Sequence, residues 1–73
     1  MKTLKINDTY TACAIVEGFS AFEPTEKQTI RAWAYLIKTG VAWQLQGWYG
    51  RNASRLIDAG VISRQGKIDW SKL

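Results

Sequence analysis

The stretch EPTEKQTIRAWAYLIKTG, residues 23–40, reads as one complete helix with both ends marked. Thr25 followed three residues later by Gln28 forms the capping-box pattern that starts a helix. Apolar side chains then recur at the i, i+3, i+4 and i+7 positions of one helical face, namely Ile30, Trp33, Ala34 and Ile37. Gly40 suits the left-handed residue that ends many helices. The stretch therefore predicts a helix over residues 25–39.

A second amphipathic helix is predicted further along the chain, over residues 48–59. Gly47 can supply a left-handed turn before it, and Gly60 can end it. The inward stripe of this helix contains Tyr49, Ala53 and Leu56, with Ile57 beside them.

The segments that flank the second helix are harder to assign. VAWQLQ, residues 41–46, fits a single helical turn and a short strand equally well. VISRQGKIDW, residues 61–70, has two apolar flanks around Gln65-Gly66, which favours a short C-terminal β-hairpin, although Gln-Gly is a weaker turn signal than Asn-Gly.

The N-terminal part of the chain allows two interpretations. Ala12, Ile15, Val16 and Phe19 follow helical spacing, but strand alternation also fits the same residues. Asp8 as a helix cap favours a helix over residues 9–18. Residues 1–7 are expected to form a flexible tail. We therefore expect residues 1–73 to form a single, mainly α domain with three helices, arranged like a helix-turn-helix.

Length and composition bound what the core can be. With 73 residues, the chain is expected to bury only about 60% of the surface that its unfolded form exposes. Four Trp, three Tyr and two Phe are a heavy aromatic load for this length, so they should supply much of the core. The predicted core of the monomer consists of Ile30, Trp33, Ile37, Trp43, Tyr49 and Leu56.

Composition also argues against several classes of function. The chain has no His and one Cys, so the commonest general base and the usual zinc ligand sets are missing. We therefore expect no enzymatic activity, no metal and no cofactor. No apolar run reaches the about 20 residues of a membrane span, and polar residues interrupt the N-terminal segment that could resemble an export signal. A cytoplasmic location is expected.

Charge favours an acidic partner. The formal net charge is +4, and the positive excess lies mainly in the C-terminal half. That half carries five basic residues (Arg51, Arg55, Arg64, Lys67 and Lys72) against two acidic ones (Asp58 and Asp69). Nucleic acid and an acidic protein surface would both fit such a balance.

The predicted partner-binding site is the outward face of the second helix. Trp48 and Tyr49 point about 100° apart on a helix, so Tyr49 is assigned to the core and Trp48 to the surface. The site comprises Trp48, Arg51, Asn52 and Arg55 on the helix, with Arg64 and Lys67 beyond it. Tryptophan beside arginine is typical of binding hot spots, but an arginine stacked on Trp48 could equally just cover the surface.

Gly50 raises a related question within this helix. A glycine in a helix interior costs up to about 1 kcal/mol relative to alanine. Such a cost suggests that something packs close to the backbone there. The favoured candidate is the indole of Trp33 or Trp43, and the other is a partner's backbone or a phosphate.

The stretch TGVAWQLQGWYGRNASRLIDAGVI, residues 39–62, resembles a motif of short proteins from tailed bacteriophages. That family's pattern reads TGxAWQLQGxYGRxAxxLIxAG, and every specified position is matched here. Most of that family has no assigned function, so the resemblance implies an origin more than an activity. The family usually carries a small residue where this chain has Trp48, which marks Trp48 for a role particular to this protein.

By size, charge and lack of catalytic groups, the chain is also similar to small phage-encoded regulators of transcription. Those regulators act in host takeover by binding host RNA polymerase, and they inhibit σ-dependent initiation, sometimes with antitermination. This likeness implies a host protein as partner, in the host cytoplasm.

Two hypotheses of function follow. In the first, the protein binds and inhibits a host protein, with RNA polymerase as the leading candidate. In the second, it binds DNA directly as a winged helix-turn-helix, with Arg51, Asn52 and Arg55 on a recognition helix and Arg64 and Lys67 on the wing. A net charge of +4 is modest for the second hypothesis.

Overall fold

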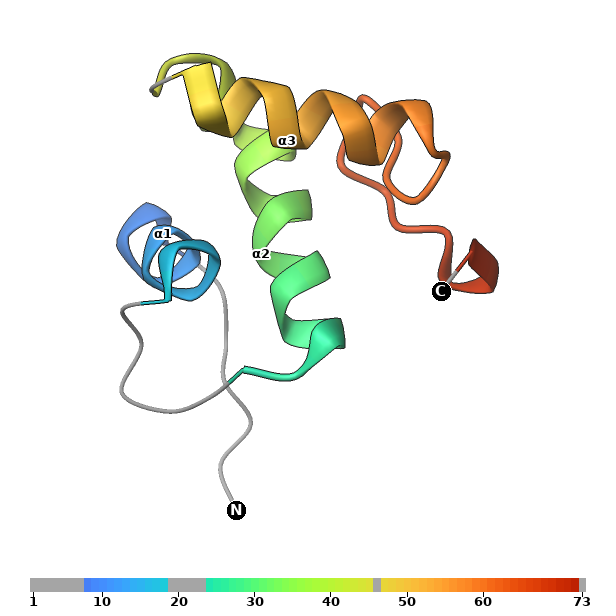
Figure 1. Ribbon diagram of the computed structural model, residues 1–73, viewed down its shortest axis with the longest axis horizontal. Helices are drawn as coiled ribbons and strands as arrows, with labels where there is room; N and C mark the ends of the chain where they lie inside the picture. The colour runs from blue at the N-terminus through green and yellow to red at the C-terminus, as the bar shows by residue number, and fades with distance from the viewer. Residues whose placement is uncertain (1–7, 19–23, 46, 73) are drawn as a thin grey trace.

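A computed structural model describes residues 8–18, 24–45 and 47–72 of the chain (Figure 1). The first element, α1, spans Thr9–Glu17. The Asp8 carboxylate caps it by accepting a hydrogen bond from the Thr11 backbone N–H at 2.7 Å. Gly18 ends it in the left-handed conformation, with φ of 81°. The helical interpretation of this segment is therefore confirmed, whereas the tail expected over residues 1–7 lies outside the described residues.

The second helix, α2, spans Glu26–Thr39 and has both ends that the sequence predicts. Thr25 and Gln28 form a complete capping box. The Gln28 N–H donates to the Thr25 hydroxyl at 3.1 Å, and the Thr25 N–H donates to the Gln28 side chain at 2.8 Å. Gly40 is left-handed, with φ of 82°. These caps are made by residues next to the helix ends, so they can be recognised in the sequence.

A 3₁₀ turn, η1, spans Val41–Trp43 and leads to the third helix, α3, at Gly47–Asp58. Of the two alternatives for the segment after Gly40, the helical turn is the one observed. The expected role of Gly47 is wrong, because Gly47 is the first residue of α3 and does not have a positive φ. A helix start takes ordinary negative φ, so no left-handed residue is needed there.

Gly60 ends α3 as predicted, with φ of 78°. The Val61 N–H donates to the Leu56 carbonyl at 3.0 Å, and the Gly60 N–H donates to the Ile57 carbonyl at 3.0 Å. This pair of bonds is a Schellman cap.

The structure does not support the possible C-terminal hairpin. In the described part of the chain, pairing after α3 is limited to an isolated antiparallel bridge between Ile62 and Ile68, and a second 3₁₀ turn, η2, follows at Trp70–Lys72. Gly66 lies so close to α2 that an added Cβ would stand 2.6 Å from Lys38 Cβ and 2.8 Å from the Ala34 carbonyl oxygen. The turn at Gly66 therefore packs directly against α2 and does not extend into solvent as a hairpin.

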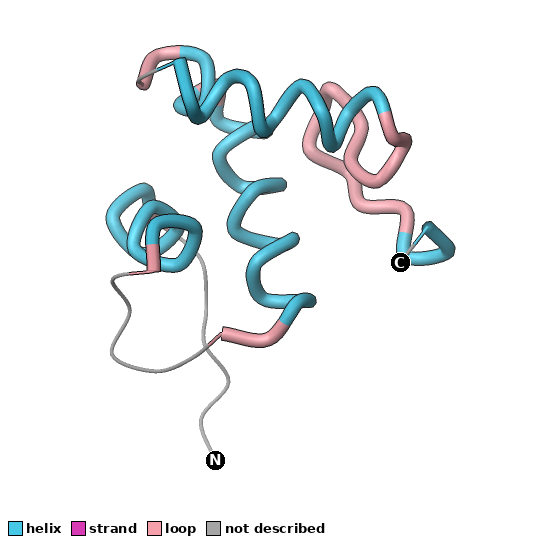
Figure 2. The backbone as a smooth tube through the Cα atoms, viewed as in Figure 1, coloured by secondary structure: helices cyan, strands magenta, loops and turns pink. Residues whose placement is uncertain are grey.

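The helices are arranged around α2, as Figures 1 and 2 show. Helix α3 runs across the C-terminal end of α2, while α1 packs against α2. The segment after α3 turns back and descends on the other side of α2. The molecule is thin, with extents of 33 × 29 × 17 Å.

The core lies where these elements meet α2. It comprises Ala12, Ile15, Ile30, Ala32, Trp33, Ala34, Leu36, Ile37, Ala42, Tyr49, Ala53 and Ile62. Four of the six predicted core residues (Ile30, Trp33, Ile37 and Tyr49) are buried, and Leu56 is partly buried against them. The assignment of Trp43 to the core is wrong, because its side chain is 49% exposed. Ala42 takes the buried position of η1 instead.

Candidate functional site

An aromatic cluster sits where α2 and the start of α3 meet. The ring centroids of Trp33 and Tyr49 are 5.9 Å apart, and those of Trp48 and Tyr49 are 4.9 Å apart with the rings edge to face. Trp48 also lies 5.8 Å from Trp33 and keeps 40% of its surface exposed. These are favourable aromatic geometries. Of Trp48 and Tyr49, Trp48 is thus the more exposed residue, as predicted, but its ring also packs against the core residue Trp33.

An open, mostly apolar groove lies on another side of α3, and we call it the Trp43 groove. It has a volume of about 440 Å³ and is lined by Trp43, Gly47, Gly50, Arg51, Ser54 and Arg55. Its lining residues on α3 fall at spacings of three or four residues, so they share one face of the helix. The indole of Trp43 projects from η1 over Gly50, because a Cβ added there would meet Trp43 Cε3 at 3.8 Å.

The groove continues into a smaller hollow of about 200 Å³ that shares Trp43 and Ser54 with it. Arg64, from the turn after α3, borders this extension together with Asp58. Among the described residues that line the two hollows, the charged side chains are therefore three arginines and one aspartate. The rim is electropositive, and it surrounds an exposed aromatic ring.

The structure brings together some of the predicted site residues and separates others. Arg51, Arg55 and Arg64 gather around the Trp43 groove and its extension. Trp48 is absent from the lining and faces Trp33 instead. Asn52 donates its side-chain amide to the Trp48 carbonyl at 2.8 Å, so it has a local partner.

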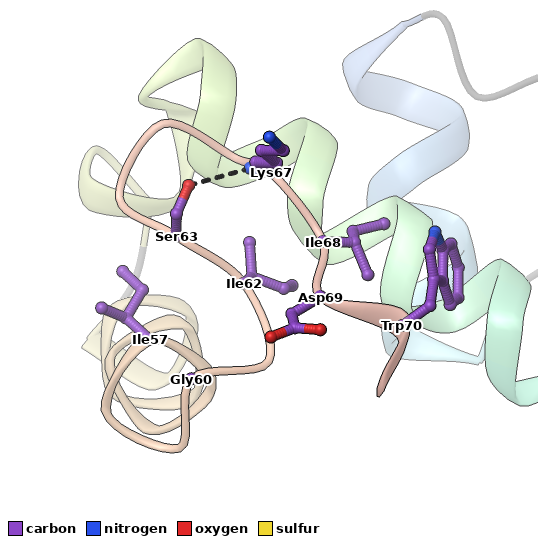
Figure 3. Close-up of a pocket in the computed structure, with 8 residues that line it drawn as sticks. All are labelled: Ile57, Gly60, Ile62, Ser63, Lys67, Ile68, Asp69 and Trp70. Carbon is purple, nitrogen blue, oxygen red and sulfur yellow. Dashed lines mark hydrogen bonds between the residues drawn. The ribbon is translucent and has the colours of Figure 1, made fainter. Parts of the chain in front are cut away.

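Lys67 belongs to a different hollow, beneath the C-terminal turn (Figure 3). That hollow is lined by Ile57, Gly60, Ile62, Ser63, Lys67, Ile68, Asp69 and Trp70. Several of its polar groups form local turns of the chain: the backbone N–H of Lys67 donates to the Ser63 hydroxyl at 3.1 Å, and the Asp69 carboxylate accepts from the Ser71 hydroxyl at 2.5 Å. We therefore assign the hollow to the packing of the C-terminal segment.

Trp43 is a surface residue that the sequence pattern does not identify as one. The segment around it is shorter than two helical turns, so its apolar spacing could not tell the buried side from the exposed one. A weak signal was nevertheless present in Gly50. The indole of Trp43 does lie beside Gly50, but a Cβ there would meet it at an ordinary 3.8 Å, so this contact does not require a glycine.

Among the described residues, three titratable groups have a shifted pKa, and local contacts explain each shift. Hydrogen bonds from the backbone and side chain of Thr11 lower the pKa of Asp8, and those from Ser71 lower the pKa of Asp69. Burial, with the nearby Glu17 carboxylate, raises the pKa of the Cys13 thiol. A raised pKa keeps a thiol protonated and unreactive near neutral pH. Within residues 8–18, 24–45 and 47–72, no group of three or more His, Cys, Asp or Glu side chains forms a candidate metal site.

The described elements define a class: small, mainly α-helical domains with three helices and an exposed face of tryptophan and arginine. The chain belongs to the family described as a domain of unknown function, DUF7417, whose model matches residues 15–72. No curated protein and no solved structure matches the chain significantly. Among the described residues, no helix has both the length and the apolar character that a bilayer span requires.

Proposed function

We propose that this protein is a non-catalytic binding protein that docks the Trp43 groove on an acidic surface of a protein partner. The observation that carries the proposal is the half-exposed indole of Trp43, flanked by Arg51 and Arg55 in an open apolar groove. Tryptophan and arginine are the residues most enriched at binding hot spots, and the centre of a protein interface is more apolar than its rim.

Within this proposal, the resemblance to phage proteins points to a host protein as the partner, and we propose RNA polymerase. Binding would then inhibit σ-dependent initiation of transcription. The basic rim of the groove supports an acidic contact surface, because complementary charge accelerates association and selects among partners.

Direct binding to duplex DNA is the second candidate. The observation in its favour is that α3 lies across the end of α2 after a short turn, as a recognition helix would lie, with Arg64 in the turn that follows α3. The apolar groove weighs against it, because protein–DNA interfaces are more polar and more positively charged than protein–protein interfaces.

Purified bacterial RNA polymerase holoenzyme, free of nucleic acid, provides the test. We expect saturable binding to the wild-type protein, measured by biolayer interferometry. Trp43→Ala should weaken it at least ten-fold, a loss of about 1.4 kcal/mol. Trp70→Ala is the matched control, because Trp70 is 42% exposed and lies away from the groove, stacked with Arg31.

Trp43 is a sharper probe than Trp48, since Trp48→Ala would also remove ring contacts with the core. Absence of binding to the polymerase would refute this choice of partner. Binding to random duplex DNA, with an affinity that falls steeply with salt, would support the second candidate instead.

A further inference from the structure

We infer that the occupant of the Trp43 groove is an acidic amphipathic helix of the partner, with an apolar side chain placed on the Trp43 indole. This inference deepens the proposed function and rests on it. It specifies the chemistry of the segment that binds, whichever protein carries that segment.

The apolar part of the recognition comes from Trp43 itself. Its indole is 49% exposed although it stands among apolar surface, and the groove beside it is open. Trp43, Leu45 and Trp48 are three of the five large apolar side chains left exposed in the described residues, and they follow one another around the start of α3. Covering the Trp43 ring with a leucine-sized side chain would remove this apolar surface from water.

The charged part comes from the arginines. Arg51 and Arg55 are both exposed, line the groove and are separated by one helical turn, which places their Cβ atoms about 6 Å apart. Two carboxylates at i and i+4 of a partner helix have the same separation, so each could meet one guanidinium. Arg64 extends the basic rim at the other end of the groove.

The length of the groove along α3 fits a helix as the occupant. Gly47 and Gly50 face the groove on α3 without side chains, and Ser54 continues the same face. A Cβ on Gly47 would meet the Arg51 guanidinium at 3.1 Å, and one on Gly50 would meet the Trp43 ring at 3.8 Å, so a partner helix would contact these two groups first. The stretch from Gly47 to Ser54 is about 10 Å long, which corresponds to about two turns of a partner helix.

The probe for this inference is a synthetic alanine-based helical peptide of about 16 residues, long enough to be helical in part. It carries one central leucine with glutamates spaced i, i+4 beside it. Two matched peptides replace the glutamates with glutamine or the leucine with serine. Binding is followed by the indole N–H signals of the four tryptophans in an NMR titration, with the Trp43 signal assigned from Trp43→Phe.

We expect a saturable shift of the Trp43 signal with the glutamate–leucine peptide, at least ten-fold weaker binding of both matched peptides, and little change at Trp70. Arg55→Glu should weaken binding at least ten-fold. Lys27→Glu makes the same change of charge at an exposed position near the start of α2, away from the groove, and should leave the affinity within about two-fold after screening by salt.

Four results would overturn the inference. They are no shift of the Trp43 signal at millimolar peptide, equal binding of the glutamine peptide, a shift with a duplex DNA but not with the peptide, and a shift on concentrating the protein alone. The last would identify a second copy of this chain as the occupant. Because the polymerase assay does not involve the peptide, polymerase binding that requires Trp43 without a peptide response would reject the acidic helix and keep the proposed function.

Discussion

Trp33 lies at the point where α2 meets α3, and it is 7% exposed with the rings of Tyr49 and Trp48 packed against it. Trp33→Ala would leave a cavity under both rings, so we expect a loss of about 3–5 kcal/mol in the free energy of unfolding. That is a large share of the stability of a small domain. Chemical denaturation measures it, and a variant with a near-normal midpoint would contradict this account of the core.

Two glycines should respond to alanine in opposite directions. At Gly50 a Cβ finds only ordinary contacts, at 3.8 Å and 3.9 Å, so Gly50→Ala should stabilise α3 by up to about 1 kcal/mol. At Gly66 a Cβ would collide with Lys38 and the Ala34 carbonyl, and φ is 84°. Gly66→Ala should therefore cost about 1–3 kcal/mol.

Thermal unfolding of the two glycine variants beside the wild type provides the measurement. Equal shifts in melting temperature would show that the turn at Gly66 does not press on α2 in solution. A destabilised Gly50→Ala would mean that the space between Gly50 and Trp43 is smaller than the structure shows.

At the scale of the element, the start of α1 depends on an ionised cap. The bonds from Thr11 hold the pKa of Asp8 below its ordinary value, so the folded state binds the proton less readily than the unfolded state. The cap's contribution to stability is therefore complete above the ordinary Asp pKa and is lost as pH falls through the lower, folded value.

Asp8→Asn isolates this contribution, because asparagine keeps an acceptor at the cap but does not titrate. Thermal unfolding of both proteins from about pH 6 to about pH 2.5 should show the wild type losing stability relative to the variant toward acid. Asp69 titrates in both proteins and cancels in the comparison. A difference that is independent of pH would show that the Asp8 bond to Thr11 does not persist in solution.

At the scale of the whole molecule, the domain is thin, because its shortest extent is 17 Å while the other two are 33 Å and 29 Å. Few large side chains can be covered completely in so thin a body, and Leu36 and Ile62 are the largest in the described residues. Exposed aromatic surface is thus partly a consequence of shape. Trp70 has one arginine, Arg31, against its ring, whereas the groove at Trp43 and its extension are lined by three arginines.

A hydrogen bond between residues far apart in the sequence joins α3 to α1. The Tyr49 hydroxyl on α3 donates to the Glu17 carboxylate at the end of α1. Tyr49→Phe keeps the ring contacts and removes the donor, so we expect a cost of about 1 kcal/mol. A double-mutant cycle with Glu17→Ala, measured by chemical denaturation, should give a coupling energy clearly above zero. Strictly additive losses would mean that α1 is held to α3 by apolar packing alone.

Local signals in the sequence determined the helices. Asp8, the Thr25–Gln28 capping box and the glycines at 18, 40 and 60 act on neighbouring backbone groups, so each could be recognised without knowledge of the fold. The apolar stripe of α2 likewise identified Ile30, Trp33 and Ile37 as core residues, because a long helix repeats its buried face several times.

Tertiary structure decided the conformation of the short segments and which side chains lie next to one another. Nothing local distinguished Trp43 from Ala42, and only the crossing of α3 over the end of α2 determined which of the two is covered. In place of the expected hairpin, the structure has a turn at Gly66 that packs against Lys38 and Ala34 of α2. As a result of the same packing, Arg51, Arg55 and Arg64 lie around Trp43 and not around Trp48. The position of a surface site depends on contacts between residues far apart in the chain.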